Sequence, residues 1–291
     1  MAHYFVFPEK DTTIFSHPTE QSLNTGLDEI LTLRDSESTT DLNHYPSRIL
    51  LQFKTKEWGD VINNIAPNKN VITASLKLYQ TEHRELAGIQ HIEVYPLAES
   101  WINGTGKLAN SPQITNGCSW KFRDGTDNRF SNTIGTSWNT GSSDGTFPNF
   151  RTASFIDDAK GGGLWWVNGD TQGTGFEASK SIDFNEDLDL NINITAPLLK
   201  QYAFEFESAG TPSGIPNNGF ILKRSESQEF TTRDDGELNY FSMDTHTIYP
   251  PYLDISWDDS TYSATESKIK KTGECYVTLR NNKEEYKTIE E

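Results

Sequence analysis

Residues 251–259 read PYLDISWDD, and this run indicates which kind of fold the chain adopts. Its apolar residues Leu253, Ile255 and Trp257 alternate with short polar ones. Because successive side chains of a β-strand point to opposite faces, the alternation predicts a strand with one buried face. The same period of two recurs in residues 49–54, 72–78, 188–194 and 202–207.

Weaker strand candidates fill much of the remaining chain, and turn sequences such as RDGTDN (123–128) and SGIPNNG (213–219) separate them. A single helical turn is predicted in TKEWGDVINNIA (55–66). The sequence shows no internal repeat of fixed period, which argues against a propeller or a solenoid. Many short strands joined by such turns predict an all-β fold, an antiparallel β-sandwich (jelly roll) with long loops and little helix. The predicted apolar stripe of the helical turn consists of Trp58, Val61, Ile62 and Ile65.

The composition changes near residue 258, which we take as the end of a single jelly-roll domain (1–258). Residues 259–291 are rich in lysine and glutamate, and we expect a charged C-terminal tail with one short strand in CYVTLR (275–280). Two interpretations of the tail stay open. It is either a frayed terminus or an arm that pairs with the sheet edge of a neighbouring subunit.

Charge and hydropathy narrow the classes of partner. The 291 residues carry a formal charge of −17, which repels phosphate backbones and anionic membrane surfaces, so we expect neither nucleic acid nor membrane as a partner. No apolar run approaches the roughly 20 residues that span a bilayer. The start at Met1 shows no secretory signal pattern, which predicts synthesis and retention in a cytoplasm. Cys118 and Cys275 are expected to be free, mostly buried thiols.

Motifs for catalysis are missing from the sequence, and we expect no enzymatic activity. The six histidines are scattered, and the glycines of KGGGLWWVNGDTQGTG (160–175) lack the lysine and helix of a phosphate loop, so this stretch reads as a β loop. A pair of carboxylates for glycoside hydrolysis stays an open alternative among 42 acidic residues. We expect no cofactor. A structural calcium ion stays possible at the oxygen-rich clusters Asp124, Asp127 and Asn128, or Asp157 and Asp158, although neither has a calcium-loop spacing.

Tryptophans are concentrated between residues 101 and 166. Trp120 shares a predicted strand face with Cys118 and Phe122 in CSWKF (118–122), which predicts a buried ring. The adjacent Trp165 and Trp166 point to opposite faces of any strand, so we expect at least one of them to be exposed or to lie under a loop. They are the weak candidates for binding a ligand or a partner.

The order of motifs along the chain resembles the DNRLRE (CBM96-like) jelly-roll modules, over roughly residues 10–258. No binding residue is transferred from that family, because long polar insertions occupy residues 104–117 and 123–162. The resemblance implies a jelly roll and, as one function, carbohydrate binding. Its motifs are SRILLQFK (47–54), VITASLKLYQTE (71–82), IEVYPLAESWINGTG (92–106), NNGFILKRSES (217–227) and PPYLDISWDD (250–259).

The opening FPEKDTTIFSHPTEQSLNTGLDEILTLRD (7–35) is similar to the start of virion structural proteins of tailed bacteriophages, particularly those of marine and cyanobacterial hosts. This resemblance implies a non-enzymatic component of the neck, tail, baseplate or fibre region, assembled in the host cytoplasm. Its partners would be other virion proteins and copies of itself. The alternative is a carbohydrate-binding module or host-surface adhesin that binds a host glycan.

Overall fold

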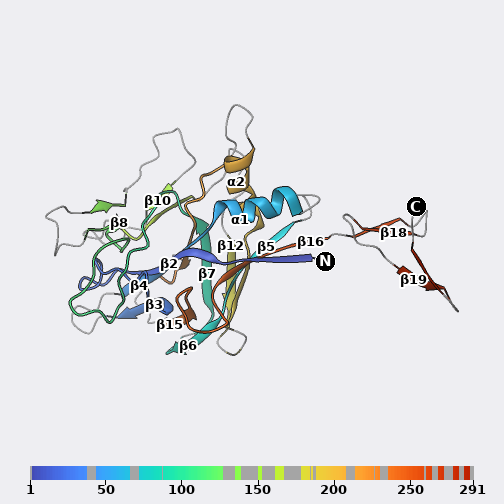
Figure 1. Ribbon diagram of the computed structural model, residues 1–291. Helices are drawn as coiled ribbons and strands as arrows, with labels where there is room; N and C mark the ends of the chain where they lie inside the picture. Colours follow the sequence, from blue (N-terminus) through green and yellow to red (C-terminus); the bar gives the residue numbers. More distant parts are fainter. Residues whose placement is uncertain are drawn as a thin grey trace.

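The computed structural model describes residues 2–37, 44–65, 72–86, 88–126, 135–138, 150–152, 161–166, 178–183, 185, 188–207, 214–225, 227–229 and 235–258, together with four short strands between residues 260 and 288. Two antiparallel sheets form a jelly-roll-like β-sandwich, and two short helices lie together at one end of it (Figure 1). This confirms the predicted all-β sandwich with long loops and little helix.

The smaller sheet has four strands in the order β1-β16-β5-β13, so β1 and β13 are its edges. Leu253 lies opposite both Val6 and Leu76 in the strand register, and all three side chains are fully buried. The alternation of residues 253–257 therefore marks a strand with one buried face, as predicted. The strands are β1 (Ala2–Val6), β16 (Tyr252–Trp257), β5 (Thr73–Leu78) and β13 (Leu190–Asn193).

The larger sheet has eight strands in the order β12-β7-β14-β4-β3-β15-β6, and β2 also pairs with β4. Its longest strand, β4, pairs with β3, β2 and β14 and so ties the sheet together. The strands are β2 (Pro8–Phe15), β3 (Ile30–Glu37), β4 (His44–Phe53), β6 (Gln80–Arg84), β7 (Gln90–Pro96), β12 (Ala178–Ile182), β14 (Phe220–Arg224) and β15 (Gly236–Phe241).

The run Ile49-Leu50-Leu51 in β4 is buried on both faces. Ile49 and Leu51 point into the main core between the two sheets, as the alternation predicts. Leu50 points the other way, where the sequence predicts a solvent-facing side chain, and it is also fully buried. A second apolar cluster covers that face of the sheet. It consists of Ile14, Leu50, Tyr95, Leu97, Trp101, Cys118, Trp120, Trp138, Trp165 and Ile221.

Helix α1 (Thr55–Asp60) and the π-helical turn η1 (Val61–Ile65) follow β4 directly, in the place where the sequence predicts a helical turn. Trp58, Val61 and Ile62 are buried in the main core, which confirms those members of the predicted stripe. The environment of the Ile65 side chain lies outside the described residues.

Helix α2 (Thr195–Phe206) corrects two sequence predictions, because residues 202–207 are not a strand and the strand of residues 188–194 is only the short β13. Pro197 sits in the first turn, where its missing N–H group leaves no hydrogen bond unmade. The buried residues Pro197, Leu198, Gln201 and Tyr202 recur at helical spacing. Alternating aromatic residues misled the prediction, since residues four apart also share one face of a helix.

The two helices pack through three aromatic rings. Trp58 of α1 meets Phe206 of α2 edge to face at 5.8 Å between ring centroids, and Tyr202 stacks on Phe206 at 5.2 Å. Gly59 leaves the space for this contact, because a Cβ atom there would lie 2.1 Å from the Phe206 ring. The helices thereby seal the end of the sandwich that both elements reach (Figure 1).

Asn24 fastens the long polar connection of residues 97–126 onto the sandwich. Its side-chain Nδ2 donates to the carbonyls of Asn103 (2.7 Å) and Cys118 (2.8 Å), and its Oδ1 accepts from the backbone N–H groups of Gly26 (3.2 Å) and Gly106 (2.8 Å). One fully buried amide therefore joins three separate chain segments. The connection is a packed layer built on the β-sheet, and the described part of the expected insertion at 104–117 belongs to it.

The sequence CSWKF (118–122) is a turn and not the predicted strand. The backbone N–H of Ser119 donates to the carbonyl of Phe122 at 2.7 Å, and β8 (Phe122–Asp124) begins only there, pairing with β9 (Thr136–Ser137). Trp120 and Cys118 are fully buried, as predicted, whereas Phe122 is only half-buried. Cys118 is a free thiol, and Cys275 lies outside the described residues.

The tail contains four short strands where the sequence predicts one. They form two hairpins, β17 with β18 and β19 with β20, and among the described residues none of the four pairs with a strand of the sandwich. The proposed role of the tail as an arm stays a prediction. The strands are β17 (Ser260–Ser263), β18 (Lys268–Lys271), β19 (Thr278–Asn281) and β20 (Glu285–Thr288).

Candidate functional site

Trp165 and Trp166 lie on β11 (Leu164–Trp166), which pairs with β10 (Phe150–Thr152). Their side chains enter two different apolar clusters, as expected for neighbours on a strand. Neither ring is exposed, with 2% and 4% of their surfaces accessible. Trp166 packs against Ile215 and Ala98, both in loops, so the expectation that one ring lies under a loop is the one that holds. A binding role for either residue stays an untested prediction.

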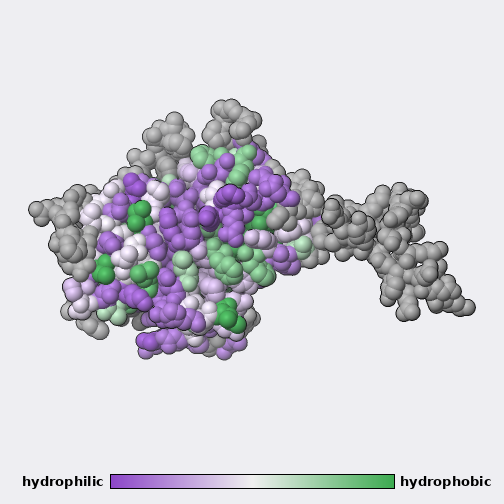
Figure 2. Space-filling view, viewed as in Figure 1, coloured by the Kyte–Doolittle hydropathy of each residue, from purple (hydrophilic) through white to green (hydrophobic). Residues whose placement is uncertain are grey.

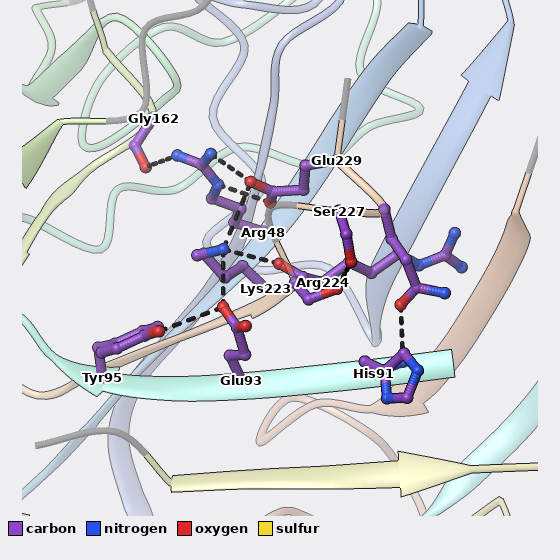
Figure 3. Close-up of polar contacts among 11 residues, drawn as sticks. Arg48, His91, Glu93, Tyr95, Gly162, Lys223, Arg224, Ser227 and Glu229 are labelled. Atoms are coloured by element: carbon purple, nitrogen blue, oxygen red, sulfur yellow. Dashed lines mark hydrogen bonds and ion pairs between the residues drawn. The ribbon is translucent and has the colours of Figure 1, made fainter. Parts of the chain in front are cut away.

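Trp165 borders a buried cluster of four charged side chains, which we call the ion cluster: Arg48, Glu93, Lys223 and Glu229 (Figure 3). The Arg48 guanidinium donates to both carboxylate oxygens of Glu229, at 2.9 and 2.6 Å. Lys223 Nζ lies 3.0 Å from a carboxylate oxygen of Glu93 and 3.7 Å from one of Glu229. Arg48, Lys223 and Glu229 are at most 2% exposed.

Aromatic rings and a glycine turn complete the surroundings of Arg48. Its guanidinium lies 4.6 Å from the ring centroid of Trp120 and 5.1 Å from that of Trp165. Its third donor reaches the carbonyl of Gly162 at 2.6 Å (Figure 3). Gly162 has a positive φ of 82°, and a Cβ atom there would lie 2.4 Å from the guanidinium. The GGG of residues 161–163 is thus a β loop, as predicted, which lets the backbone approach a buried arginine.

The ion cluster ties together elements that are distant in sequence. Arg48 lies on β4, Glu93 on β7, Lys223 on β14, and Glu229 on the loop after β14. Two positive and two negative charges balance within it, and hydrogen bonds from Arg48 and Lys223 end on backbone carbonyls. These contacts join the loops that carry Gly162 and Glu229 to strand β4 of the larger sheet.

Only one residue of the two expected calcium clusters lies in the described part of the chain. Asp124 is exposed on β8, whereas Asp127, Asn128, Asp157 and Asp158 lie outside the described residues. Within the described ranges, no group of three or more histidine, cysteine, aspartate or glutamate side chains is arranged to hold a metal ion. A calcium ion elsewhere in the chain stays untested.

The most accessible cluster of large apolar side chains lies on the outer face of the smaller sheet, and we call it the aromatic strip. Phe5 and Phe7 are half exposed, Tyr249 is 44% exposed, and Ile248 beside it is 84% exposed. In Figure 2, apolar atoms gather in the middle of the visible face, where Figure 1 places β1. The strip consists of Phe5, Phe7, Tyr79, Phe241, Ile248, Tyr249 and Tyr252.

The rings of the aromatic strip meet at different angles, and two of their five pairs pack edge to face. Phe5 meets Tyr252 at 5.1 Å and 70°, and Tyr79 meets Tyr249 at 5.0 Å and 63°. The hydroxyls of Tyr79 and Tyr252 are 3.2 Å apart. Such tilted rings present edges and faces in several directions and do not make a flat platform.

A balanced set of charges lies next to the strip. Asp254 accepts a hydrogen bond from His3 (2.9 Å) and pairs with Lys77 (2.9 Å), which also lies 5.7 Å from the Tyr252 ring centroid. Burial raises the pKa of Asp254, but the contacts with His3 and Lys77 outweigh it and hold the pKa below its ordinary value. The carboxylate that borders the strip is therefore charged and paired with a lysine, although the chain as a whole is strongly acidic.

Sequence reasoning placed the candidate aromatic contacts on Trp165 and Trp166 and missed the aromatic strip. A signal was present, because Phe5 and Phe7 alternate with Tyr4 and Val6 and give β1 an apolar outer face as well as an apolar inner one. The remaining members come from the start of β16 and the loop before it, from the residue after β5 and from the end of β15. Only the fold brings those three segments together.

Asp11 on β2 is a buried carboxylate close to the loop that follows β15. It is 1% exposed and accepts a hydrogen bond from the backbone N–H of Met243 at 2.6 Å. Burial, which is the largest influence, and the nearby Asp244 raise its pKa to about 7, although the Met243 hydrogen bond acts in the opposite direction. The side chain therefore changes charge close to neutral pH.

We expect Asp11→Asn to stabilise the protein at pH 8 and to leave its stability nearly unchanged at pH 4. Between pH 4 and 7 the unfolded chain releases the Asp11 proton while the folded chain keeps it, so stability of the native protein falls as pH rises. The loss amounts to at most about 4 kcal/mol, at roughly 1.4 kcal/mol for each pKa unit. The measurement is urea unfolding of both proteins from pH 4 to 8. A stability difference that does not grow with pH would contradict the assignment.

No protein-family model matches the chain, and no curated protein matches it either. Among the described residues there is no helix long and apolar enough to cross a membrane.

Proposed function

We propose that the chain is a non-enzymatic structural component of a tailed-phage virion that acts through protein–protein assembly. The observation that carries the proposal is the aromatic strip, a row of exposed apolar side chains on a chain with a formal charge of −17. Exposed apolar patches of this kind mark contact surfaces. The resemblance of residues 7–35 to virion structural proteins of tailed bacteriophages supports a virion as the assembly.

The geometry of the strip favours a protein over a sugar. The rings of the strip lie at angles from 23° to 70° to one another, so they form an uneven surface that fits the irregular side chains of a partner protein, whereas a pyranose ring stacks best on a flat face. The exposed Ile248, in the loop that precedes β16, adds an aliphatic side chain with no means of hydrogen bonding to hydroxyl groups.

Purified particles provide the direct test. We expect mass spectrometry to find the chain in virions purified from lysates, and labelled antibody to decorate one region of them in electron micrographs, which decides between neck, tail, baseplate and fibre. Absence of the chain from purified virions overturns the proposal.

Ile248→Asp tests the strip itself. We expect incorporation into particles to fall at least about tenfold, because a buried interface would have to accept an unpaired charge. Ile89→Asp is the matched control, since Ile89 is 52% exposed and lies outside the strip. Both variants are scored by quantitative mass spectrometry of virions from complemented infections. Equal incorporation of the two variants would remove the strip from the assembly surface.

A carbohydrate-binding module or host-surface adhesin is the second candidate function. One observation favours it: the outer face of the smaller sheet continues from the strip into short polar side chains, among them Ser256, Asn191 and Asn193. Retention on host polysaccharide, lost on Tyr252→Ala, would support it. Trp165→Ala and Trp166→Ala are unsuitable probes, because both rings are buried and their removal leaves cavities.

A further inference from the structure

The edge strands of the two sheets differ in how well they are protected from pairing with another chain. β2 begins with Pro8, Glu9 and Lys10 and carries an irregularity in its register there. β6 carries Glu82 and Arg84, and its register shifts opposite Asn239 and Tyr240. Charges, prolines and bulges of this kind keep edge strands from pairing with other chains.

The third edge strand of the larger sheet, β12, carries a charge at its centre, Lys180. The two edges of the smaller sheet are not alike. β13 has four residues, Leu190–Asn193, and runs almost directly into helix α2, which leaves little length for a new strand. β1, of sequence AHYFV, contains no proline, no aspartate, glutamate, lysine or arginine, and no shift in its register with β16. Among the described residues, β16 is the only strand that pairs with β1. Figure 1 shows β1 in dark blue along the front of the sandwich.

We propose that β1 pairs with β1 of a second copy of the chain, antiparallel and about a twofold axis, so that the two smaller sheets become one continuous sheet. The inference rests on the proposed assembly role and names a first partner for it. An antiparallel pair of identical strands satisfies the exposed N–H and C=O groups of both edges by the same contacts. Pairing all five residues of Ala2–Val6 places the twofold axis at Tyr4.

In this register every side chain meets a suitable neighbour. On the inner face Ala2 lies opposite the second copy's Val6 and Tyr4 opposite its own counterpart, and all three residues belong to or pack against the main core. On the outer face His3 lies opposite Phe5, and these two rings are already neighbours within one strand at 6.4 Å. The two halves of the aromatic strip then meet across the axis.

The carboxylate of Asp254 on β16, the strand next to β1, is balanced by its contacts with His3 and Lys77. At long range two chains of formal charge −17 repel each other. We therefore expect the dimer to tighten as salt is raised from low to moderate concentration, because salt screens that repulsion.

The test is the mass of the full chain by light scattering and sedimentation over a concentration series. We expect a dimer, and we expect His3→Lys combined with Phe5→Lys to raise its dissociation constant at least roughly tenfold by facing lysine with lysine. Ser179→Lys with Ser181→Lys is the matched control, since it adds the same charge to exposed positions of the edge strand β12. A monomer up to about 0.1 mM, or equal dissociation constants for the two variants, overturns the inference.

Cysteine pairing tests the register. In a Cys275→Ser background, we mix differently tagged His3→Cys and Phe5→Cys copies and oxidise them. The mixed disulfide is expected to exceed either self-disulfide severalfold, because directly opposite Cβ atoms lie about 5 Å apart and diagonal ones about 7 Å. Circular dichroism confirms that each variant is folded. Chains that are monomeric but present in virions refute the dimer alone, whereas β1 dimers absent from virions refute the virion proposal alone.

Discussion

Replacing Glu229 by Gln is expected to lower the free energy of unfolding by about 3–5 kcal/mol, because it leaves the buried Arg48 without its carboxylate partner and Lys223 with Glu93 alone. Arg48 keeps its hydrogen bond to the Gly162 carbonyl and its contacts with two tryptophan rings. Those contacts cannot replace a charged partner. The change is read from urea unfolding monitored by tryptophan fluorescence.

Glu82→Gln is the matched control for this experiment. Glu82 pairs with Arg84 on β6, but both side chains are more than half exposed. Exposed pairs of this kind contribute between 0 and about 1 kcal/mol, so the control should unfold almost as the native chain does. If the Glu229 variant lost less than about 1 kcal/mol, the cluster would contain room for water and would not be the dry contact described above.

Replacing Asn24 by Ala is expected to destabilise the protein by about 3 kcal/mol and to detach the packed layer of residues 97–126 from the sandwich. Four hydrogen bonds are lost, and the carbonyls of Asn103 and Cys118 and the N–H of Gly106 are left without their partner in a buried site. Limited proteolysis should then cut between residues 102 and 118 at protease concentrations that leave the native chain intact.

Two further variants sharpen the result. Asn24→Asp keeps the shape but turns an oxygen toward two carbonyl groups, so it should be at least as damaging as alanine. Asn191→Ala removes an exposed asparagine from β13 and should change neither stability nor cleavage. Cleavage that starts outside residues 102–118 in the Asn24 variants would show that another contact limits opening of the layer.

Sequence patterns predicted the sandwich because most strands are read from local alternation. They failed where two faces of a strand are both buried, as at Leu50, since the covering layer comes from residues 97–126 and 161–166, far along the chain. They also failed at α2, where aromatic residues two apart imitate a strand while residues 197, 198, 201 and 202 form the buried helical stripe. In both cases the deciding contact is tertiary.

The candidate sites were harder to predict for the same reason. Tryptophan content pointed to Trp165 and Trp166, yet burial depends on what covers a ring, and here the loops of Ala98 and Ile215 and the Arg48 guanidinium do so. The partners in the ion cluster are 181 residues apart for Arg48 and Glu229. No local spacing encodes such a pair.

The pairing of β1 with β16 has a consequence for synthesis of the protein. Ala2 lies opposite Trp257 and Val6 opposite Leu253. β1 therefore stays unpaired during synthesis until the ribosome has made about 250 further residues and β16 is available. During that time an apolar, unprotected strand is available to any other chain emerging nearby. We therefore expect nascent chains on one polysome to be able to pair through β1 before any of them has closed its own smaller sheet.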